Sequence, residues 1–573
     1  ASRGLGDVYK RQEVMRGGGS ALFGSSAIAG TINIITKEPL RNSGQLSHTL
    51  TALGGGSSFD NNTSLNASLV TDDHRAGLYI FGQNRHRSGY DYDGDGFTEL
   101  PKLKNQTVGF RSYLKTSTYS KLTFEYHHMQ EFRRGGDMLD RPPHEAHIAE
   151  QLQHSIDGGS LKFDYFSPDE KNRLSIFASA ANTDRDSYYG PGNDPLKAYG
   201  KTTDLTAMGG AQYVHTFDKC FFMPSDLTAG LEYNRDRLKD NMWGYDRHTD
   251  QTVNIYSAFL QNEWKNDRWG ILIGGRLDKH NMVDNVIFSP RANLRFNPTQ
   301  NINLRLSYSS GFRAPQAFDE DMHIENVGGT VAMIERAKNL KEEKSQSFSA
   351  SADMYHRFGV FQTNFLIEGF YTRLTDVFVL GEPYDRGDGI LVKTRSNGPG
   401  AKVMGLTLEG KVAYLSILQI QAGLTLQRSR YDEPHKWHDD APAEKKIFRT
   451  PDTYGYFTAT YTPIKPLSIA LSGTYTGRML VQRMDITAEN AELGAMPERK
   501  AEAIRTPRFF DLGVKLAYDF KLYKTVDLQL NGGIQNLFES YQKDFDRGAN
   551  RDSGYIYGPS LPRSFFAGVK ISY

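Results

Sequence analysis

The sequence has one cysteine, no long apolar run and almost no excess of charge of either sign. Among its 573 residues only Cys220 is a cysteine, which excludes an intramolecular disulfide and a metal cluster held by cysteines. No run of about 18 apolar residues occurs, so membrane-spanning helices are excluded. The formal net charge is +1, which argues against a general nucleic-acid binder.

Catalytic and targeting signals are missing as well. The chain contains no Gly-x-Ser-x-Gly, no His-Glu-x-x-His and no cysteine nucleophile with a sited partner, so we predict that it is not an enzyme. No secretory signal peptide is visible at the start. Residues 1–12 carry no clear period, and we expect a non-native or artefactual start there.

Aromatic residues and glycine are abundant for so polar a chain, with 31 Tyr, 33 Phe and 55 Gly. The last residues alternate: Phe565, Ala567, Val569, Ile571 and Tyr573 would point one way, and the polar residues between them the other. One face is apolar and the other mostly polar. This pattern is typical of the closing strand of an outer-membrane β-barrel, although a half-buried strand of a soluble sheet alternates in the same way.

The same alternation recurs along the chain and favours the barrel. It is found at 304–308, 418–427, 467–472 and 526–531, where the residues opposite the apolar set are too polar for a protein core. Long polar segments such as 129–157 and 316–345 alternate with short ones such as 297–299. We therefore predict an all-β fold: a transmembrane antiparallel barrel of about 22 strands, each of about 10 residues.

Residues 13–37 contain the most specific motif of the chain. They read Glu-Val-Met-Arg-Gly-Gly-Gly-Ser-Ala-Leu-Phe-Gly and continue to Gly-Thr-Ile-Asn-Ile-Ile-Thr-Lys. This resembles the end of the plug domain of TonB-dependent outer-membrane receptors. The segments 533–541 and 561–573 resemble the last two strands of that family. Tyr308–Pro315 and Asn339–Ser345 resemble two boxes that are prominent in its haem receptors, although Lys338 replaces a proline.

The resemblance implies three regions: the start at 1–12, the C-terminal part of a plug at 13–40 and a receptor barrel at 41–573. It implies a multi-pass barrel in the outer membrane of a Gram-negative cell. It also implies energisation by the TonB–ExbB–ExbD inner-membrane complex and outer-membrane lipid around the barrel, and it leaves a surface lipoprotein partner open. The family's contact segment for that complex precedes the plug, so we expect an N-terminally truncated or processed chain that does not transport by itself.

The resemblance to haem receptors suggests candidate ligand-binding residues. His323 lies between the two boxes, where those receptors carry a loop histidine, and a neutral imidazole is a good iron ligand. An ordinary surface histidine fits the sequence equally. Phe312 and Arg313 of the first box join the candidates, and the aromatic residues Tyr188, Tyr189, Trp243 and Tyr245 could either stack on a flat macrocycle or form an interface belt.

Asp91 to Glu99 form a second candidate site. Asp91, Asp93 and Asp95 take positions 1, 3 and 5 of a calcium-loop pattern, with Gly96 at position 6. Lys102 replaces the glutamate of position 12, and Glu99 could substitute for it. Either a calcium-ordered outer loop or a plain Asp/Gly turn fits. Such calcium loops occur in the family's cobalamin receptors.

Together these features predict energised uptake of a large metal chelate, with no prosthetic group. Haem or an iron-siderophore complex is favoured, because of His323, and cobalamin is the alternative, because of Asp91 to Glu99. Two functions of other classes stay open: a passive porin-like channel and a surface receptor that does not transport.

Overall fold

The predicted alternation is present in the strands of the computed structural model. In the last strand, Phe565, Val569 and Ile571 are 36–45% exposed on the outer face of the barrel, and Tyr573 directly after it is 64% exposed. The outward residues Leu304 and Leu306 are likewise 38% and 55% exposed. Side chains of opposite parity face the interior, as Asp527, Gln529 and Asn531 do. The apolar face therefore points outward, which is the arrangement that lipid requires and a soluble core does not.

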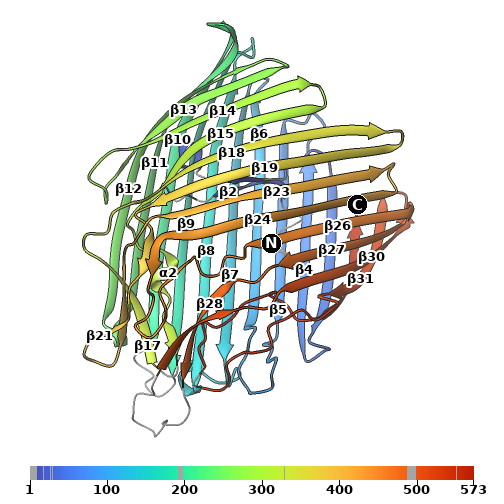
Figure 1. Cartoon of the computed structure of the whole chain (residues 1–573). Helices are drawn as coiled ribbons and strands as arrows, with labels where there is room; N and C mark the ends of the chain where they lie inside the picture. The colour runs from blue at the N-terminus through green and yellow to red at the C-terminus, as the bar shows by residue number, and fades with distance from the viewer. Residues whose placement is uncertain are drawn as a thin grey trace.

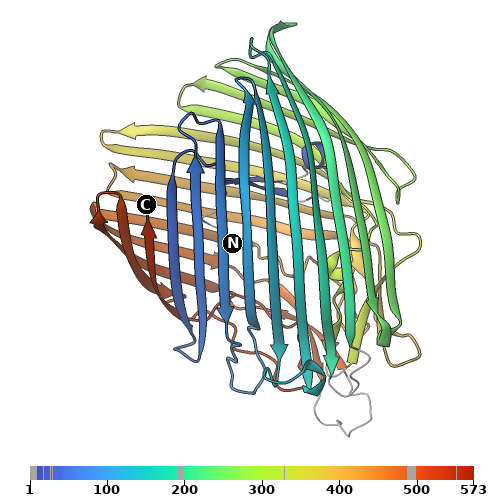
Figure 2. The same ribbon diagram turned by 180° about the vertical axis from the view of Figure 1, so that it is seen from behind.

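The structure describes residues 9–573 except 17–18, 26, 29, 192–197, 328–329, 487–498 and 550. Within this part of the chain, 22 strands close one antiparallel barrel, as predicted (Figures 1 and 2). The last strand closes the ring by pairing with the first barrel strand, with Val569 opposite His48 and Ile571 opposite Leu46. No helix in the described residues is long and apolar enough to cross a membrane.

Each barrel strand pairs with its neighbours in chain order. The strands are β3 (Ser43–Leu53), β4 (Ser58–Val70), β5 (Ala76–Arg87), β6 (Lys102–Ser117), β7 (Ser120–Gly136), β8 (Ile148–Phe166), β9 (Asn172–Pro191), β10 (Tyr199–Cys220), β11 (Met223–Met242), β12 (Arg247–Lys265), β13 (Trp269–His280), β14 (Ile287–Thr299), β15 (Ile302–Arg313), β18 (Glu343–Phe358), β19 (Phe361–Thr375), β23 (Ala401–Tyr414), β24 (Leu418–His435), β26 (Thr453–Ile464), β27 (Leu467–Thr476), β30 (Phe509–Tyr523), β31 (Val526–Gln535) and β32 (Ser564–Ser572).

The connections are short at one end of the barrel and long at the other. Residues 221–222, 300–301 and 359–360 make short turns, whereas 314–342, 376–400 and 536–563 are long loops at the opposite end. This confirms the predicted asymmetry. Many strands are longer than expected, up to the 22 residues of β10. Their ends near the long loops carry polar residues on both faces, so the apolar alternation that marks a strand in the sequence stops before the strand does.

The long loops contain short elements of their own. They are η1 (Pro143–Glu145), η2 (Trp243–Tyr245), α2 (Asp319–Met322), β16 (Glu325–Val327), β17 (Thr330–Arg336), β20 (Phe378–Leu380), β21 (Tyr384–Asp385), β22 (Leu391–Asn397), β25 (Glu444–Lys446), β28 (Leu480–Ile486) and β29 (Arg499–Arg505). Strands β17 and β22 pair in parallel and join two different loops into one small sheet. The loops at this end thus fold against one another over the barrel mouth.

The N-terminal segment lies against the inner wall of the barrel. Strands β1 (Tyr9–Arg16) and β2 (Gly30–Thr36) form a hairpin, and helix α1 (Ser20–Phe23) contacts β13, β14 and β15. The backbone N–H of Phe312 donates to Ser20 Oγ at 3.1 Å, and Ser345 Oγ donates to the Ile28 carbonyl at 2.9 Å. A Cβ on Gly311 would lie 2.6 Å from the Ala27 carbonyl oxygen, so only glycine allows this approach.

Two ion pairs tie the other end of this segment to the wall, where Glu38 accepts from Arg111 at 3.2 Å and from Lys121 at 3.1 Å. Residues Tyr9–Gln12 pair with β2 in the hairpin, although they belong to the start that we expected to be artefactual. Residues 1–8 lie outside the described part of the chain. The position of 13–40 in the lumen suits a plug segment, and its role as part of a plug stays a prediction.

Candidate functional site

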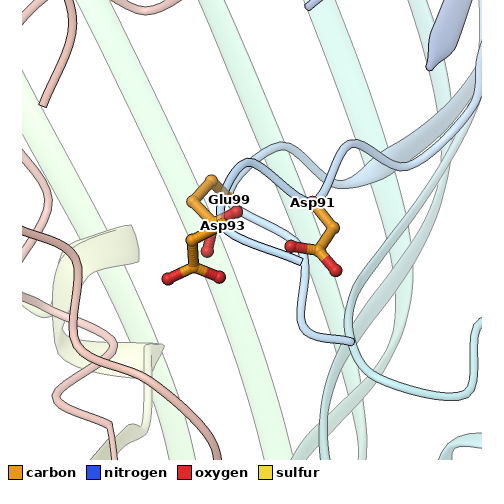
Figure 3. A group of neighbouring side chains, drawn as sticks. All are labelled: Asp91, Asp93 and Glu99. Atoms are coloured by element: carbon orange, nitrogen blue, oxygen red, sulfur yellow. The ribbon is translucent and has the colours of Figure 1, made fainter. Parts of the chain in front are cut away.

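The acidic loop 88–101 joins β5 to β6 at the long-loop end of the barrel. Carboxylate oxygens of Asp91, Asp93 and Glu99 lie within 4.8 Å of one another (Figure 3). Calcium binds oxygen ligands at about 2.3–2.6 Å, so two oxygens on one ion lie at most about 5 Å apart, and the three carboxylates satisfy this limit. The same oxygens also shape the loop, because Asp91 accepts from the N–H groups of Gly94 at 2.7 Å and Gly96 at 2.8 Å.

Two arginines of loop 536–563 hold the acidic loop. Arg547 Nε lies 3.1 Å from Asp93 Oδ2, and Arg551 Nη1 lies 3.2 Å from Glu99 Oε1. The other arm of Arg551 pairs with Asp95. Asp95 is therefore turned toward the arginine rather than toward the other three carboxylates. The guanidinium groups supply positive charge that a bound cation would otherwise supply, and calcium binding stays a prediction.

Burial and hydrogen bonding act in opposite directions on this pair of loops. Burial acts to raise the pKa of Asp95, but the N–H of Gly548 and the Arg551 guanidinium outweigh it and lower the pKa below its usual value. Burial raises the pKa of Glu99, against the opposing hydrogen bond from the N–H of Tyr92 and the charge of Arg551. Asp95 is thus the carboxylate that the docked loops hold in its ionised form.

The predicted aromatic residues lie mainly in the core of the loops. Tyr188, Tyr189 and Tyr245 are at most 4% exposed and pack with Ala146, Met242 and Ile390, among others. The Tyr245 hydroxyl donates to the Tyr189 carbonyl at 2.8 Å. In this conformation the three tyrosines hold the loops together and offer no free ring face. Trp243 differs, because it is 59% exposed at the tip of η2.

Phe312 and Arg313 occupy structural positions at the top of β15. Phe312 is buried against Val283 and Ile287. The Arg313 guanidinium lies 4.0 Å from the ring centre of Phe318 and pairs with Glu320. The first box therefore fixes the start of loop 314–342 and its helix α2. Contact of either residue with a ligand stays a prediction.

His323 directly follows α2 and is partly buried. Its ring lies edge-on to that of Tyr189, with 5.3 Å between the centroids. The preceding residues Asp319, Glu320 and Asp321 make α2 a short acidic turn. The structure thus brings His323 and Tyr189 together, as two predicted ligand residues from distant parts of the chain. It places Asp91, Asp93 and Glu99 in a separate group.

Five arginines surround the acidic turn, and sequence reasoning did not find them. We call them the arginine cluster; they are Arg185, Arg247, Arg313, Arg336 and Arg395 from β9, β12, β15, β17 and β22. Arg185 donates to Asp319 at 2.7 Å, and Arg395 contacts Glu320 at 2.6 Å and Asp321 at 2.8 Å. No spacing in the sequence marks this group, because its members are separated by whole strands and loops.

Several donors of the cluster stay unused by the protein. Arg247 contacts Asp240 and the Met322 carbonyl, both at 2.9 Å, through Nη2 alone. Among the residues that the structure describes, its buried Nε and Nη1 have no hydrogen-bond partner, and neither does Nε of Arg395. A buried guanidinium N–H without an acceptor is costly, and an anionic ligand would satisfy it. The cluster therefore has the chemistry of an anion-binding site.

One cavity close to His323 is small in this conformation. A cavity of about 230 Å³ lies between β7, β8 and the two docked loops, and Arg133, Glu99, Tyr189 and Ile324 are among the residues that line it. Sites for organic ligands usually measure about 300–1,000 Å³. A large chelate could enter this cavity only if the loops moved apart.

The closed barrel, its lipid-compatible outer face and its asymmetric loops define an outer-membrane β-barrel protein. The chain matches the family model described as TonB dependent receptor-like, beta-barrel, over residues 30–537. It therefore belongs to the TonB-dependent receptors, which are transporters and not enzymes. Membership implies energisation by the TonB–ExbB–ExbD complex and a chelate ligand. The long loops accordingly lie at the cell surface.

Solved structures of siderophore receptors have the same fold. The siderophore receptor PirA from Acinetobacter baumannii is 16% identical with a TM-score of 0.76, over 99% of this chain and 85% of that one. A mutant ferric enterobactin receptor, PfeA from Pseudomonas aeruginosa, is 17% identical with a TM-score of 0.75, over 99% and 85%. The ferric-catecholate import receptor Fiu from E. coli K12 is 14% identical with a TM-score of 0.71, over 99% and 86%. No curated protein sequence matches the chain.

Proposed function

We propose that this receptor takes up a ferric siderophore whose iron-binding oxygens carry negative charge. The observation that carries the proposal is the arginine cluster beneath the surface loops, where buried donors of Arg247 and Arg395 have no partner within the described part of the chain. Ferric catecholate complexes are polyanions, and guanidinium groups bind anionic oxygens through charge-assisted hydrogen bonds. The names of the structural neighbours PirA, PfeA and Fiu support the same ligand class.

The acidic turn α2 occupies the cluster in the present conformation. Asp319 and Glu320 pair with the arginines, although their side chains are 83% and 53% exposed. Such exposed partners are held weakly and are open to exchange. An anionic chelate would replace these two carboxylates on the arginines, while the buried Asp240 on β11 keeps its contact with Arg247. Displacement of α2 would also enlarge the small cavity beside it.

Fluorescence titration of the purified chain tests this function. Trp243 is an exposed reporter on η2, next to the loop core that contains Tyr245. We expect a ferric tris-catecholate to quench it at lower concentration than a charge-neutral ferric tris-hydroxamate. Salt should reduce the difference, because screening weakens charge-assisted binding. Trp243→Phe is the control that assigns the signal, and equal affinity for both complexes at low salt contradicts the proposal.

Separate binding measurements on the same chain distinguish two other ligands. A sharpened, red-shifted Soret band with hemin that disappears in His323→Ala would establish haem as the ligand and His323 as its iron ligand. Calcium-dependent binding of cyanocobalamin that is lost in Asp93→Ala would establish cobalamin uptake. His323 stands beside the arginine cluster, so haem, which carries two propionates, is the second candidate.

A further inference from the structure

The outer face of the barrel carries a broad apolar groove away from the loops. It has a volume of about 1180 Å³ and crosses β13, β14, β15, β18, β19, β23 and β24, of which the last four lie side by side on the face toward the viewer in Figure 1. Small outward residues, Ala292, Ala350 and Gly369, alternate with larger ones such as Phe348. A Cβ on Gly369 would meet no atom within 4 Å, so the floor of the groove is open.

On three neighbouring strands, the outward-facing side chains change from apolar to basic at the loop end of this groove. The strands are β19, β23 and β24, and on each of them the last apolar outward residue is followed two positions toward the loops by a cation. The pairs are Tyr371 and Arg373, Met404 and Lys402, and Leu426 and Arg428. Arg373 is in register with Lys402, and Lys402 with Arg430, so the cations form one patch.

The patch has an excess of positive charge. Asp432 pairs with Arg373 at 3.0 Å and with Lys402 at 2.9 Å. Arg428 and Arg430 are exposed, and neither has an ion-pair partner in the described part of the chain. Four cations therefore face one carboxylate, and two arginines are available to an external anion. Arg428 itself lines the groove, so charge and apolar surface are continuous.

This arrangement is local and is not a belt around the barrel. On β9, the outward residues at the loop end are Asp184 and Asp186, and both are exposed. A second basic row, Arg235 and Arg237 on β11, is also exposed and outward, but neither residue lines the groove. Within the described residues, only the face formed by β18 to β24 combines a hollow at hydrocarbon depth with free arginines directly above it.

We propose that this face binds one lipid of the outer leaflet that carries phosphate groups and several acyl chains. The acyl chains would fill the groove, where burial of apolar surface is favourable. The phosphate would contact Arg428 and Arg430, which match the bidentate geometry of phosphate oxygens. Charge complementarity selects this occupant, because an apolar protein surface would leave both arginines unpaired. The site is independent of the ligand proposed for the arginine cluster.

Native mass spectrometry of the full chain in detergent tests the site. The probe is a bis-phosphorylated, multiply acylated glucosamine disaccharide lipid, compared with the same lipid after removal of its phosphates. One phosphorylated lipid should remain bound per chain, and the dephosphorylated lipid should bind more weakly. Each basic residue near an anionic lipid contributes about 1 kcal/mol, so the double variant Arg428→Gln/Arg430→Gln should bind about 30-fold more weakly.

Two further variants separate the parts of the proposal. Arg235→Gln/Arg237→Gln on β11 removes the same charge elsewhere on the outer face and should leave binding unchanged. Gly369→Phe keeps every charge and fills the groove, so it should weaken binding of the multiply acylated lipid. Equal binding by the Arg428/Arg430 variant, or an equal loss in the β11 variant, would overturn the site. A dimer of the chain that Gly369→Phe dissociates would assign the groove to a second copy instead.

Discussion

Glu320→Gln tests whether the acidic turn competes with the transported ligand. Glu320 Oε1 contacts Arg395 at 2.6 Å and also pairs with Arg313. Burial acts to raise the pKa of Glu320, but hydrogen bonds from these two arginines outweigh it and hold the pKa below its usual value. The carboxylate is therefore ionised at neutral pH. The amide keeps the size of the side chain and removes the charge.

The expected effect follows from the exposure of the side chain. The Glu320 side chain is 53% exposed, so each of its two ion pairs contributes much less than a buried pair would. We take about 0.5 kcal/mol for each of them. In Glu320→Gln, a ligand that binds the arginines would no longer have to break these two ion pairs, which together contribute about 1 kcal/mol. The affinity for an anionic ferric chelate should rise about fivefold. The affinity for a neutral ferric chelate should stay the same, because it does not compete for the arginines.

Titration of the Trp243 fluorescence with a ferric tris-catecholate and a neutral ferric tris-hydroxamate measures both affinities. Glu335→Gln is a matched control, because Glu335 is an exposed glutamate of the same loop that forms no ion pair with the arginine cluster in the described residues. Unchanged or weaker binding of the tris-catecholate by Glu320→Gln would refute the reasoning. An equal change for both ligands would instead indicate that the loop has lost its structure.

Three shorter predictions concern the acidic loop and the barrel wall. If loop 88–101 binds calcium, the ion should raise the melting temperature of the purified chain, and Asp93→Asn should abolish the increase; no effect of calcium on the parent chain would contradict the calcium prediction. Because the pKa of Asp95 is lowered, its ionised form stabilises the docked loops above pH 3.8, its unfolded pKa, and this stabilisation is lost as the pH falls from 3.8 through the lowered pKa. Protease cleavage near Arg551 should then increase on acidification, and Asp95→Asn should remove this pH dependence. Leu530→Arg on the outer face should destabilise the folded barrel in bilayers by about 2–4 kcal/mol, whereas Asn531→Arg, which faces the lumen, should cost much less, and equal losses in a urea titration would show that the two faces are wrongly assigned.

Most of the barrel could be predicted from the sequence. Alternation such as that of Leu418 to Gln427 carries the position and the facing of a strand, because one side must suit lipid and the other water. The strand ends could not be predicted in this way. At the ends of β9 and β10, polar residues stand on both faces beyond the membrane, and only the backbone pairing of Thr202 with Arg185 and its neighbours shows that the strands continue.

The candidate sites were predictable only in part. Asp91, Asp93 and Glu99 lie within nine residues of one another, so their grouping is a local property of one loop. Their arginine partners are more than 440 residues away in the sequence, because Arg547 and Arg551 belong to the last long loop. Tyr188 and Tyr245 were candidates from the sequence for stacking on a ligand or for an interface belt, but their burial depends on loops that meet only in the folded chain.

The sequence alone therefore determined the class of protein, because a membrane imposes a repeating demand on every strand and that repeat is written locally. The motif at residues 13–37 added the family, through a local pattern of the same kind. Only the tertiary structure decided which charged residues share a site. Arg185, Arg395 and the acidic turn α2 come from three distant segments. Ring closure of the barrel together with docking of the loops brings Arg185 within hydrogen-bonding distance of Asp319 and Arg395 within that distance of Glu320.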